Sequence, residues 1–556
     1  MSSCRSRVHL QCIKRAPTKS PFSPTLPVAH CSMVEILLPS LHMLPPTLPF
    51  LCVLLLFAWL RFKNRSKMRS NPFPPGPRKL PLIGSALSIP SSYQWIQFAK
   101  WAKAYGSDLI HLDVFGTSIV VLNSYNAASD LLEKRSSIYS NRPKLIMATE
   151  IMGWKNSMFF KQYDDTWRAG RRLLHEQFNS GVVSRFRPQQ TALSNRILLR
   201  LLESPADFST HIRSAMGAFS MSLAYGIDVL PERDPLVELA AETLAAAVQA
   251  SNPGSFLVDF IPLLKHVPGW LPGASFVRNG RKWKKDSAYV VNSPFIQVKR
   301  ALADGVAVPS FTRTGLEALE GRDDRESREA VLKFAAADIY VGAADTSVAA
   351  LHGFFLGMLA NPQAMRAAQA ELDSVIKPGF LPSFEDEEHL PYISAIVSES
   401  IRWHTINPIA IPHSNSDDDV YHGYRIPADS IIIANIWAMT HDENEYPDPF
   451  AFRPERFLTK EGALDRTVRD PRTLVFGFGR RICPGMHLGT SLLWIIIASI
   501  LNCFDIAKAR DEAGVEIEPT YEGSSGLVSY PKPFKCSISP RSSEVEDLIK
   551  MTTEAF

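Results

Sequence analysis

Apolar residues recur at helical spacing along most of the chain, and this pattern predicts amphipathic helices. Alternation of apolar and polar residues, which is typical of strands, is confined to 108–122, 406–435 and 515–540. These proportions predict an α+β fold that is mainly α. The stretches expected to be helical are 125–135, 164–178, 191–203, 236–250, 327–359, 362–376, 391–404 and 486–503.

One of these stretches differs from the rest, because Val331–Leu359 is apolar on most of its faces. A helix of this kind belongs in the middle of a large core. The chain between residues 85 and 540 has no short repeat and no Pro- or Gly-rich linker that would divide it. We therefore expect this part to form one large domain.

The whole chain is expected to divide into five segments. They are a disordered extension over 1–35, a transmembrane anchor over 36–62, a basic and proline-rich hinge over 63–84, the large domain over 85–540 and a tail over 541–556. Hydrophobic residues make up 46% and charged residues 21% of the 556, which excludes a mainly disordered chain, a collagen and a coiled coil.

The expected anchor rests on an apolar run that is followed by positive charges. Ile36–Leu60 contains no Asp, Glu, Lys or Arg and is long enough to cross a bilayer. The basic residues after it predict that the downstream chain stays in the cytosol, so we expect a single-pass protein in the lipid of the endoplasmic reticulum membrane. Four prolines within the run would kink or shorten the helix, and a cleaved signal peptide is the alternative. The basic residues are Arg61, Lys63, Arg65, Lys67 and Arg69.

Net charge and cysteine usage narrow the class of protein. The formal net charge is only +4, and the first 70 residues hold ten Lys and Arg against one acid. The large domain therefore lacks the basic character of a nucleic-acid binder, and no nucleic-acid partner is expected. Seven cysteines are too few for a disulfide scaffold in a chain of this length and fit a reducing compartment.

The chemistry is concentrated in residues 476–485, whose sequence is Phe-Gly-Phe-Gly-Arg-Arg-Ile-Cys-Pro-Gly. The glycines allow the backbone to pass close to a flat ligand, and Cys483 stands where a long apolar helix is expected to begin. Backbone N–H groups and the helix dipole favour a thiolate there, and a thiolate is a suitable axial ligand for haem iron. Without these surroundings, Cys483 would be a small buried hydrophobe. A zinc site is not expected, because only His487 lies close in the sequence.

This segment resembles the haem-binding loop of the cytochrome P450 family, and the other family motifs follow in order between Pro74 and Pro540. The matching positions are Phe476, Gly479, Arg481, Cys483 and Gly485. The resemblance implies the P450 fold, haem b as the cofactor, Phe476 beside it and the Cys483 thiolate as the axial ligand of its iron.

Two further groups of residues are assigned roles by the resemblance. Glu399, Arg402 and Arg456 are similar to the family's Glu-Arg-Arg triad, which implies a structural role behind the haem loop. Without the resemblance, Glu399 and Arg402 would be an ordinary surface ion pair, and Trp167 and Arg171 would indicate only an amphipathic helix. The side chains implied to donate hydrogen bonds to the two haem propionates are Trp167, Arg171, His413 and Arg481.

An acid and two hydroxyls interrupt the apolar run 331–359, at Asp345, Thr346 and Ser347. Such groups are costly within a buried helix unless they are hydrogen-bonded or used, and a threonine hydroxyl there often bonds back to the preceding turn. Asp345 and Thr346 resemble the acid–alcohol pair of the family's oxygen-activation motif. The resemblance implies that this pair is catalytic and delivers protons.

The overall layout resembles fungal microsomal P450 monooxygenases of secondary and xenobiotic metabolism. It implies insertion of one oxygen atom from O₂ into an apolar small organic molecule, with electrons from NADPH through cytochrome P450 reductase and with cytochrome b5 as a further candidate partner. Two alternatives stay open: a P450-fold peroxide isomerase or dehydratase that needs no reductase, and a haem sensor without turnover. The intact Asp345–Thr346 pair favours the monooxygenase. By analogy, the substrate pocket is expected from 143–160, 336–341, 406–411 and 524–527, with Trp154, Phe159 and Phe160 as candidate aromatic walls.

Overall fold

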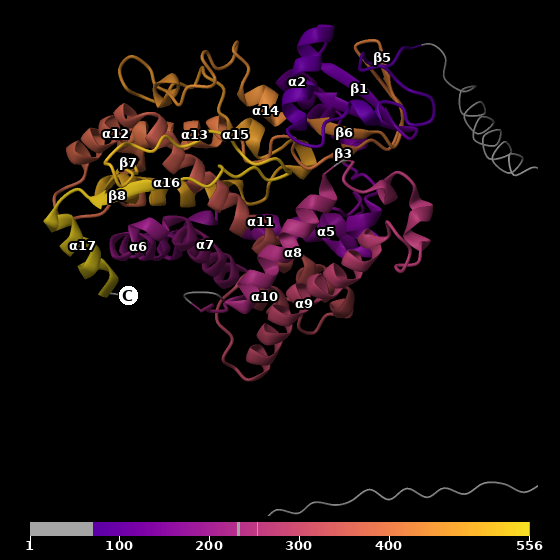
Figure 1. Cartoon of the computed structure of the whole chain (residues 1–556). Coiled ribbons are helices and arrows are strands. Elements are labelled where there is room, and N and C mark those ends of the chain that lie inside the picture. Colours follow the sequence, from indigo (N-terminus) through magenta and orange to yellow (C-terminus); the bar gives the residue numbers. More distant parts are fainter. Residues whose placement is uncertain (1–70, 231–233, 253, 555–556) are drawn as a thin grey trace, which may run out of the picture. The chain divides into compact units, whose positions relative to one another are not determined.

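The computed structural model describes residues 71–230, 234–252 and 254–554, and most of this part is helical (Figure 1). The expected N-terminal extension and transmembrane anchor lie outside the described residues. The longer helices are α2 (Gln94–Tyr105), α5 (Asp165–Phe178), α6 (Arg187–Glu203), α7 (Phe208–Tyr225), α8 (Pro235–Ser251), α9 (Ser275–Ala303), α11 (Arg325–Ala360), α12 (Pro362–Val375), α13 (Pro391–Trp403), α16 (Met486–Cys503) and α17 (Ser543–Glu554).

Shorter helical segments connect these helices. They are α3 (Tyr125–Ala128), α4 (Ser136–Tyr139), α10 (Phe311–Glu317), α14 (Ile436–Thr440) and α15 (Arg472–Val475). Short 3-10 or π segments that bear on the site are η3 (Ser129–Lys134), η5 (Trp154–Asn156), η8 (Leu257–Asp259), η11 (Pro454–Phe457) and η12 (Gly479–Arg481).

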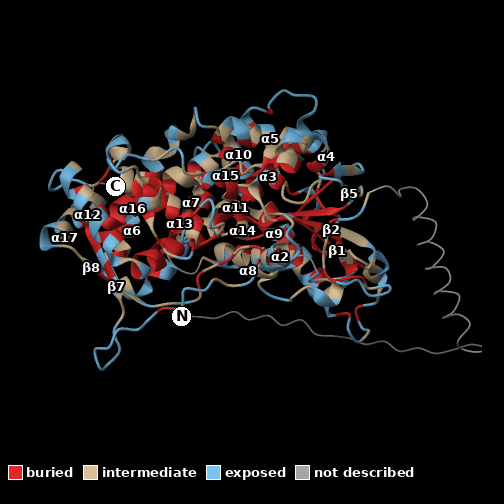
Figure 2. Ribbon diagram, turned by 90° about the horizontal axis from the view of Figure 1, so that it is seen from above, coloured by how far each residue is buried: buried red, intermediate tan, exposed pale blue. Residues whose placement is uncertain are grey.

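The core is built around α11, which packs against α5, α7, α13 and α16. Figure 2 shows buried residues gathered along α11 and α16 in the interior. The helix expected over 327–359 is confirmed, and it extends from Arg325 to Ala360. Among the described residues, α11 and α16 are apolar and long enough to cross a bilayer, but most of their apolar windows lie buried inside the domain. Their composition is therefore that of core helices.

A four-stranded sheet forms the second structural part, with the strand order β1-β2-β6-β3. The hairpin expected over 108–122 is confirmed: β1 (Leu109–Val114) and β2 (Thr117–Leu122) are antiparallel, with Leu109 opposite Leu122. The segment expected to be β-like over 406–435 supplies β6 (Ile431–Ala434), parallel to β2, and β3 (His413–Ser414), antiparallel to β6. The remaining strands form two antiparallel pairs, β4 (Asp419–Tyr421) with β5 (Tyr424–Ile426) and β7 (Phe504–Lys508) with β8 (Cys536–Pro540).

Several elements differ from the sequence-based expectation. Only β8 forms a strand within 515–540, because Pro519, Pro531 and Pro533 lack the N–H that a strand ladder needs. The helix α7 was not expected, because it is buried on several faces and its apolar residues do not form one stripe. The helix α9 was also not expected, and it continues through Pro294, whose ring is buried in the packed core. Tertiary packing therefore overrides the local signal at both helices.

The folded unit reaches beyond the boundaries expected from the sequence. It begins at Asn71, within the segment assigned to the hinge. There the Pro72 carbonyl accepts from the Arg425 N–H and the Pro75 carbonyl accepts from the His111 N–H, so this stretch is tied to β5 and β1. At the other end, the segment assigned to a tail forms α17, which packs against α6 (Figure 1).

Candidate active site

A cavity of about 350 Å³ lies between α5, α11 and the loop 476–485, with residues of α7 and α8 at its border. Its surface is mostly apolar. The predicted cofactor residues all border this cavity, although they come from segments that are distant in the sequence. They are Trp167, Arg171, His413, Phe476, Arg481 and Cys483.

The loop that presents Cys483 is held in one tight conformation. Gly477 and Gly479 have φ angles of +78° and +57°, a left-handed region that glycine adopts without strain. A Cβ atom on Gly479 would lie 2.1 Å from the backbone oxygen of Leu132, so no larger residue fits there. The Cys483 N–H donates to the Phe476 carbonyl (2.8 Å), which closes the loop just before α16 begins.

The surroundings of Cys483 act on the pKa of its thiol in two opposite directions. Burial raises the pKa of the Cys483 thiol above its ordinary value, while the Gly485 N–H and the Arg171 guanidinium act in the opposite direction. The helix N-terminus alone therefore does not make this residue a thiolate, and a metal ion would supply the missing positive charge. Burial raises the pKa of Cys503 and of Cys536 to about 12, and neither borders the cavity.

Arg481 and Trp167 are adjacent, but backbone carbonyls already engage them. Arg481 donates through Nε to Ser140 O (2.8 Å), through Nη1 to Met158 O (3.1 Å) and through Nη2 to Lys161 O (2.7 Å). The Trp167 Nε1–H also donates to Met158 O (3.3 Å), and the Arg481 guanidinium lies 4.4 Å from the centre of the Trp167 ring. These contacts fix both side chains at the cavity border, with some N–H groups of Arg481 still free to bind a ligand.

Arg142 borders the same cavity, although the sequence analysis did not single it out. Its Nη1 donates to Ile411 O (2.7 Å) and Pro412 O (2.8 Å), and its buried Nε has no partner among the described residues. His413 Nδ1 lies 2.8 Å from Tyr139 O, so Nδ1 carries a proton and donates it. Burial, together with the charge of Arg142, lowers the pKa of His413 well below its ordinary value. His413 is therefore neutral, and its Nε2 can donate to a propionate only after that anion raises its pKa.

The positive side chains around the cavity fit an anionic ligand. Burial lowers the pKa of Arg142 and of Arg171, and neither has a carboxylate partner in the described ranges. Burial also lowers the pKa of Arg481 to about 9. Buried positive charge without a counter-charge is unfavourable, and carboxylates of a ligand would relieve it. Together with the thiol of Cys483 and the apolar surface, these residues fit a haem with its two propionates.

The predicted acid–alcohol pair borders the cavity from α11. The Thr346 hydroxyl donates to the Gly342 carbonyl one turn earlier (2.7 Å). Asp345 Oδ1 lies 3.3 Å from Arg213 Nη1, and the Tyr530 hydroxyl is close enough to the same carboxylate to affect its pKa. Burial raises the pKa of Asp345, while Arg213 and Tyr530 lower it. A second cavity of about 220 Å³, between α7, α8 and α11, reaches Asp345 from another side.

Comparison with known protein families shows to which family a chain with these cavity residues belongs. The model of the cytochrome P450 family matches residues 74–538. The chain belongs to the cytochrome P450 family. Members of this family bind haem through a cysteine thiolate that coordinates the iron, so haem is the cofactor of this P450.

The curated relatives of this P450 include fungal monooxygenases. It is 45% identical over 488 residues to cytochrome P450 monooxygenase 98 of Postia placenta, a match that covers 87% of this chain and 94% of the relative. It is 41% identical to cytochrome P450 monooxygenase ple1 of Rhodocybe pseudopiperita, over 92% of this chain and 97% of the relative. It is 40% identical to tryptamine 4-monooxygenase of Psilocybe cyanescens, over 88% and 97%. This P450 is accordingly a monooxygenase and an oxidoreductase.

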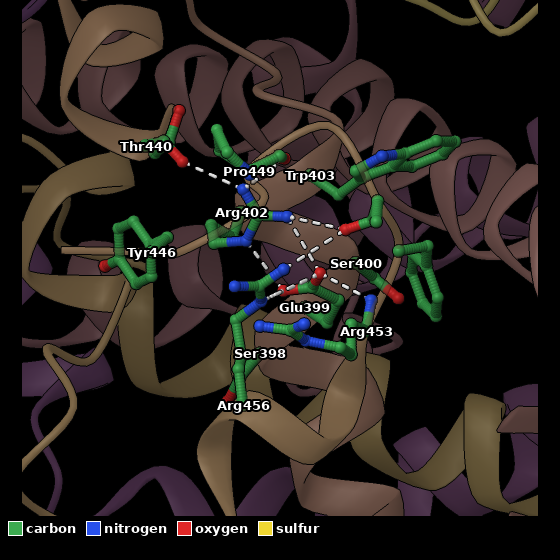
Figure 3. Close-up of polar contacts among 12 residues, drawn as sticks. Ser398, Glu399, Ser400, Arg402, Trp403, Thr440, Tyr446, Pro449, Arg453 and Arg456 are labelled. Carbon is green, nitrogen blue, oxygen red and sulfur yellow. Dashed lines mark hydrogen bonds and ion pairs between the residues drawn. The ribbon is translucent and has the colours of Figure 1, made fainter. Parts of the chain in front are cut away.

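The three residues predicted to form a triad lie together, away from the cavity (Figure 3). Glu399 accepts from Arg402 Nε (2.7 Å) and Nη2 (2.8 Å), from the Arg453 N–H (2.8 Å) and from Arg456 Nε (3.2 Å). Arg402 also donates through Nη1 to Thr440 O (2.9 Å). The side chains of Glu399 and Arg402 are completely buried. This network joins α13 to η11 and to the segment after α14.

Residues of the segments expected to form the substrate pocket border the cavity. Trp154, Phe159 and Phe160 border the cavity, together with residues of 406–411 and with Leu527. The wall also contains Asp338, an acid within α11 that the sequence analysis did not single out.

Proposed function

We propose that this P450 inserts one oxygen atom from O₂ into an apolar small organic molecule, a secondary metabolite or a xenobiotic, with electrons from NADPH through a separate cytochrome P450 reductase. The observation that carries the proposal is the position of Asp345 and Thr346, which border the same cavity as Cys483. Reductive use of O₂ requires protons at the site, and an acid–alcohol pair supplies them. A rearrangement of peroxides has no such requirement.

The chain offers a separate group to each part of the cofactor. Cys483 Sγ would hold the iron, and Phe476 would pack beside the ring. Haem, when bound, supplies the activation of O₂. The unpartnered Nε–H of Arg142 and the guanidinium of Arg171 would bind the propionates. The other residues proposed for this role are Trp167, His413 and Arg481.

Asp345 and Thr346 would move protons between water and the reacting oxygen. Thr346 holds a proton at Oγ1, which it now shares with the Gly342 carbonyl. Asp345 borders the second cavity as well, and its raised pKa brings it closer to neutral pH, where a proton carrier is most effective. Arg213 and Tyr530 hold the carboxylate in that position. The apolar wall would keep other water away from the reaction.

The proposed electron donors are separate proteins, cytochrome P450 reductase and, as a second candidate, cytochrome b5. The anchor proposed over 36–62 would hold the enzyme in the endoplasmic reticulum membrane with residues 85–540 in the cytosol, because basic residues follow the apolar run. Release of the full-length protein from microsomes by carbonate would contradict the anchor.

The test uses the haem-loaded enzyme with reductase, NADPH and a substrate that it converts. We expect Thr346→Ala to oxidise NADPH but to spend most of its electrons on the reduction of O₂ to hydrogen peroxide. The ratio of product to NADPH consumed should fall by roughly tenfold, just below a typical general-acid contribution. The measurement is the ratio of product to NADPH consumed. Ser347→Ala removes the neighbouring hydroxyl and should keep the wild-type ratio.

Unchanged coupling in Thr346→Ala would contradict the proton-carrying role. Product formation by the wild type without any reductase or NADPH would contradict the proposed reaction itself.

A further inference from the structure

Asp338 is a buried carboxylate in the wall of the large cavity, and the proposed chemistry does not use it. Its Oδ1 accepts from the Ser157 hydroxyl (2.6 Å) and its Oδ2 from the Met158 N–H (2.7 Å). Only 5% of Asp338 is exposed, and no cationic side chain pairs with it in the part of the chain that the structure describes. Burial raises the pKa of Asp338 to about 7. A buried charge without a counter-charge is costly, and such groups concentrate at functional sites.

A structural role alone does not require an acid at this position. Asp338 joins α11 to the segment that carries Ser157 and Met158, and this junction shapes one side of the cavity. An asparagine could make the same two contacts, because its carbonyl can accept from Met158 and its amide can donate to Ser157 Oγ. The negative charge therefore adds a cost that the junction does not explain.

Two other buried polar groups lack partners in the described part of the chain. Trp154 borders the cavity and is 2% exposed, and its Nε1–H has no acceptor among the described residues. The hydroxyl of Tyr225 is buried and also has no partner there. Burial raises the pKa of Tyr225, and the charge of Asp338 adds to this effect, so the two side chains are close enough to interact. A ligand at this wall of the cavity would therefore meet a buried carboxylate that no cation of the described residues neutralises.

We propose that Asp338 binds a positively charged nitrogen of the substrate, so that this P450 oxidises organic amines that carry an apolar ring system. The inference rests on the monooxygenase function proposed above and names its substrate class. Each carboxylate oxygen of Asp338 has one lone pair left after its present hydrogen bond. The aromatic side chains of Phe159 and Phe160 border the same cavity, and ring faces attract cations.

The position of Asp338 along α11 also indicates which part of the substrate reacts. Eight residues separate Asp338 from Thr346, which corresponds to a rise of about 12 Å along the helix. A nitrogen held at Asp338 would place the far part of the molecule near the proton-carrying pair. Oxidation is therefore expected on the ring system, away from the nitrogen.

The experiment compares two probes of the same shape that differ in charge. They are 2-(2-naphthyl)ethyltrimethylammonium and its neutral carbon isostere, 2-(3,3-dimethylbutyl)naphthalene. A quaternary nitrogen cannot coordinate the iron, so it reports only on the wall of the cavity. Dissociation constants are measured by calorimetry on the haem-loaded full-length enzyme.

We expect Asp338→Asn to weaken binding of the cation by roughly tenfold to hundredfold and to leave binding of the neutral probe within about threefold. Asp338→Ser carries the same expectation if the asparagine variant does not load haem. Ser157→Ala removes one hydrogen bond of the junction but keeps the charge, and it should keep the wild-type ratio of the two constants. Asp259→Asn is a second control, because Asp259 is a half-buried carboxylate in η8 that does not border the cavity.

The inference would be overturned if the Asp338 variants kept the wild-type ratio of the two dissociation constants. This includes the case in which both probes bind more weakly by the same factor. Turnover of the same probes with NADPH and reductase separates this result from the proposed function. Oxidation of the neutral probe with an unchanged ratio contradicts only the role of Asp338, whereas oxidation of neither probe contradicts the monooxygenase. Oxidation of the cation at its N-methyl groups, rather than on the naphthalene, would overturn the proposed orientation.

Discussion

At the scale of single residues, three cysteines in the described ranges differ sharply in their surroundings. Cys483 borders the cavity, whereas Cys503 and Cys536 do not. The residue type alone does not indicate which of the three cysteines is the ligand of the haem iron. Cys483 is predicted as the ligand because of the loop around it. The glycines of this loop and the helix that follows are local features that are visible in the sequence.

Cys483→Ser is expected to abolish the red-shifted absorption band of the reduced carbon monoxide complex, because that band requires a thiolate on the haem iron. Cys503→Ser is the control, since Cys503 is buried in α16 away from the cavity. The measurement is the difference spectrum of the two purified variants. A normal band in Cys483→Ser would show that another group is the iron ligand.

Asp338→Asn should change the pH dependence of stability. The pKa of Asp338 is about 7 in the folded chain and 3.8 ordinarily, so the folded state keeps a proton that the unfolded state has released between these values. The free energy of unfolding of the wild type therefore falls by about 1.4 kcal/mol per pH unit in this window, relative to the variant. The variant should be clearly more stable at about pH 8 and similar to the wild type at about pH 4.

The measurement is the unfolding midpoint of both proteins across this pH range. Tyr225, whose pKa the charge of Asp338 also affects, stays neutral throughout because burial raises its pKa. Parallel pH profiles for the wild type and the variant would show that Asp338 does not titrate in this window.

At the scale of elements, the haem loop depends on close contact with η3. Gly479 meets the backbone oxygen of Leu132, whereas Gly477 has nothing within 4 Å of the place where a Cβ would lie. Both glycines have positive φ angles, so an alanine at either position would strain the backbone. Only at Gly479 would it also clash with a neighbouring atom. The pattern of glycines was visible in the sequence, but only the packing of the loop on η3 shows which glycine is irreplaceable.

Gly479→Ala should lower the free energy of unfolding by more than the roughly 1–3 kcal/mol that backbone strain alone costs, because a backbone oxygen cannot move aside as a flexible side chain can. Gly477→Ala should cost only that strain. The ratio of haem to protein and the unfolding midpoint measure both effects. Equal losses in the two variants would show that the contact with η3 does not limit the loop.

Elements also show where sequence patterns were sufficient. The long apolar run predicted α11 almost to its ends, because a buried helix needs apolar residues on all faces. The helices α7 and α9 were not predicted, because their apolar residues form only weak helical patterns. Contacts with neighbouring elements stabilise these two helices. Of the strands expected over 515–540 only β8 forms, because prolines earlier in this segment lack the N–H that a strand ladder needs.

At the scale of the whole molecule, the buried network of Glu399 joins segments that are about fifty residues apart. Four donors meet its carboxylate, and Arg402 is equally buried. A buried ion pair adds little stability compared with an apolar core, but the loss of one partner leaves the other as an unpaired charge. The network therefore fixes the relative positions of its segments.

Glu399→Gln should lower the free energy of unfolding by about 3–5 kcal/mol and reduce haem loading, because Arg402 and Arg456 lose their counter-charge. Glu317→Gln is the matched control: it breaks an exposed pair with Arg313 on α10, which is worth about 0.5 kcal/mol or less. Chemical denaturation of both variants measures the difference. A loss no larger than that of the control would show that the triad does not hold the core.

Local motifs along the chain were enough to predict the loop around Cys483, the pair Asp345–Thr346, the buried helix around that pair and the family that these features share. Such features are set by residues within a few turns of one another, where spacing fixes geometry. The distant residues that meet these motifs became visible only in the folded chain. Arg142 joins the positive group, Tyr530 reaches Asp345, and Asp338 stands in the cavity wall without a cationic partner among the described residues. An arginine, a tyrosine or an acid has no distinctive pattern along the chain, because its role depends on what lies opposite it after folding.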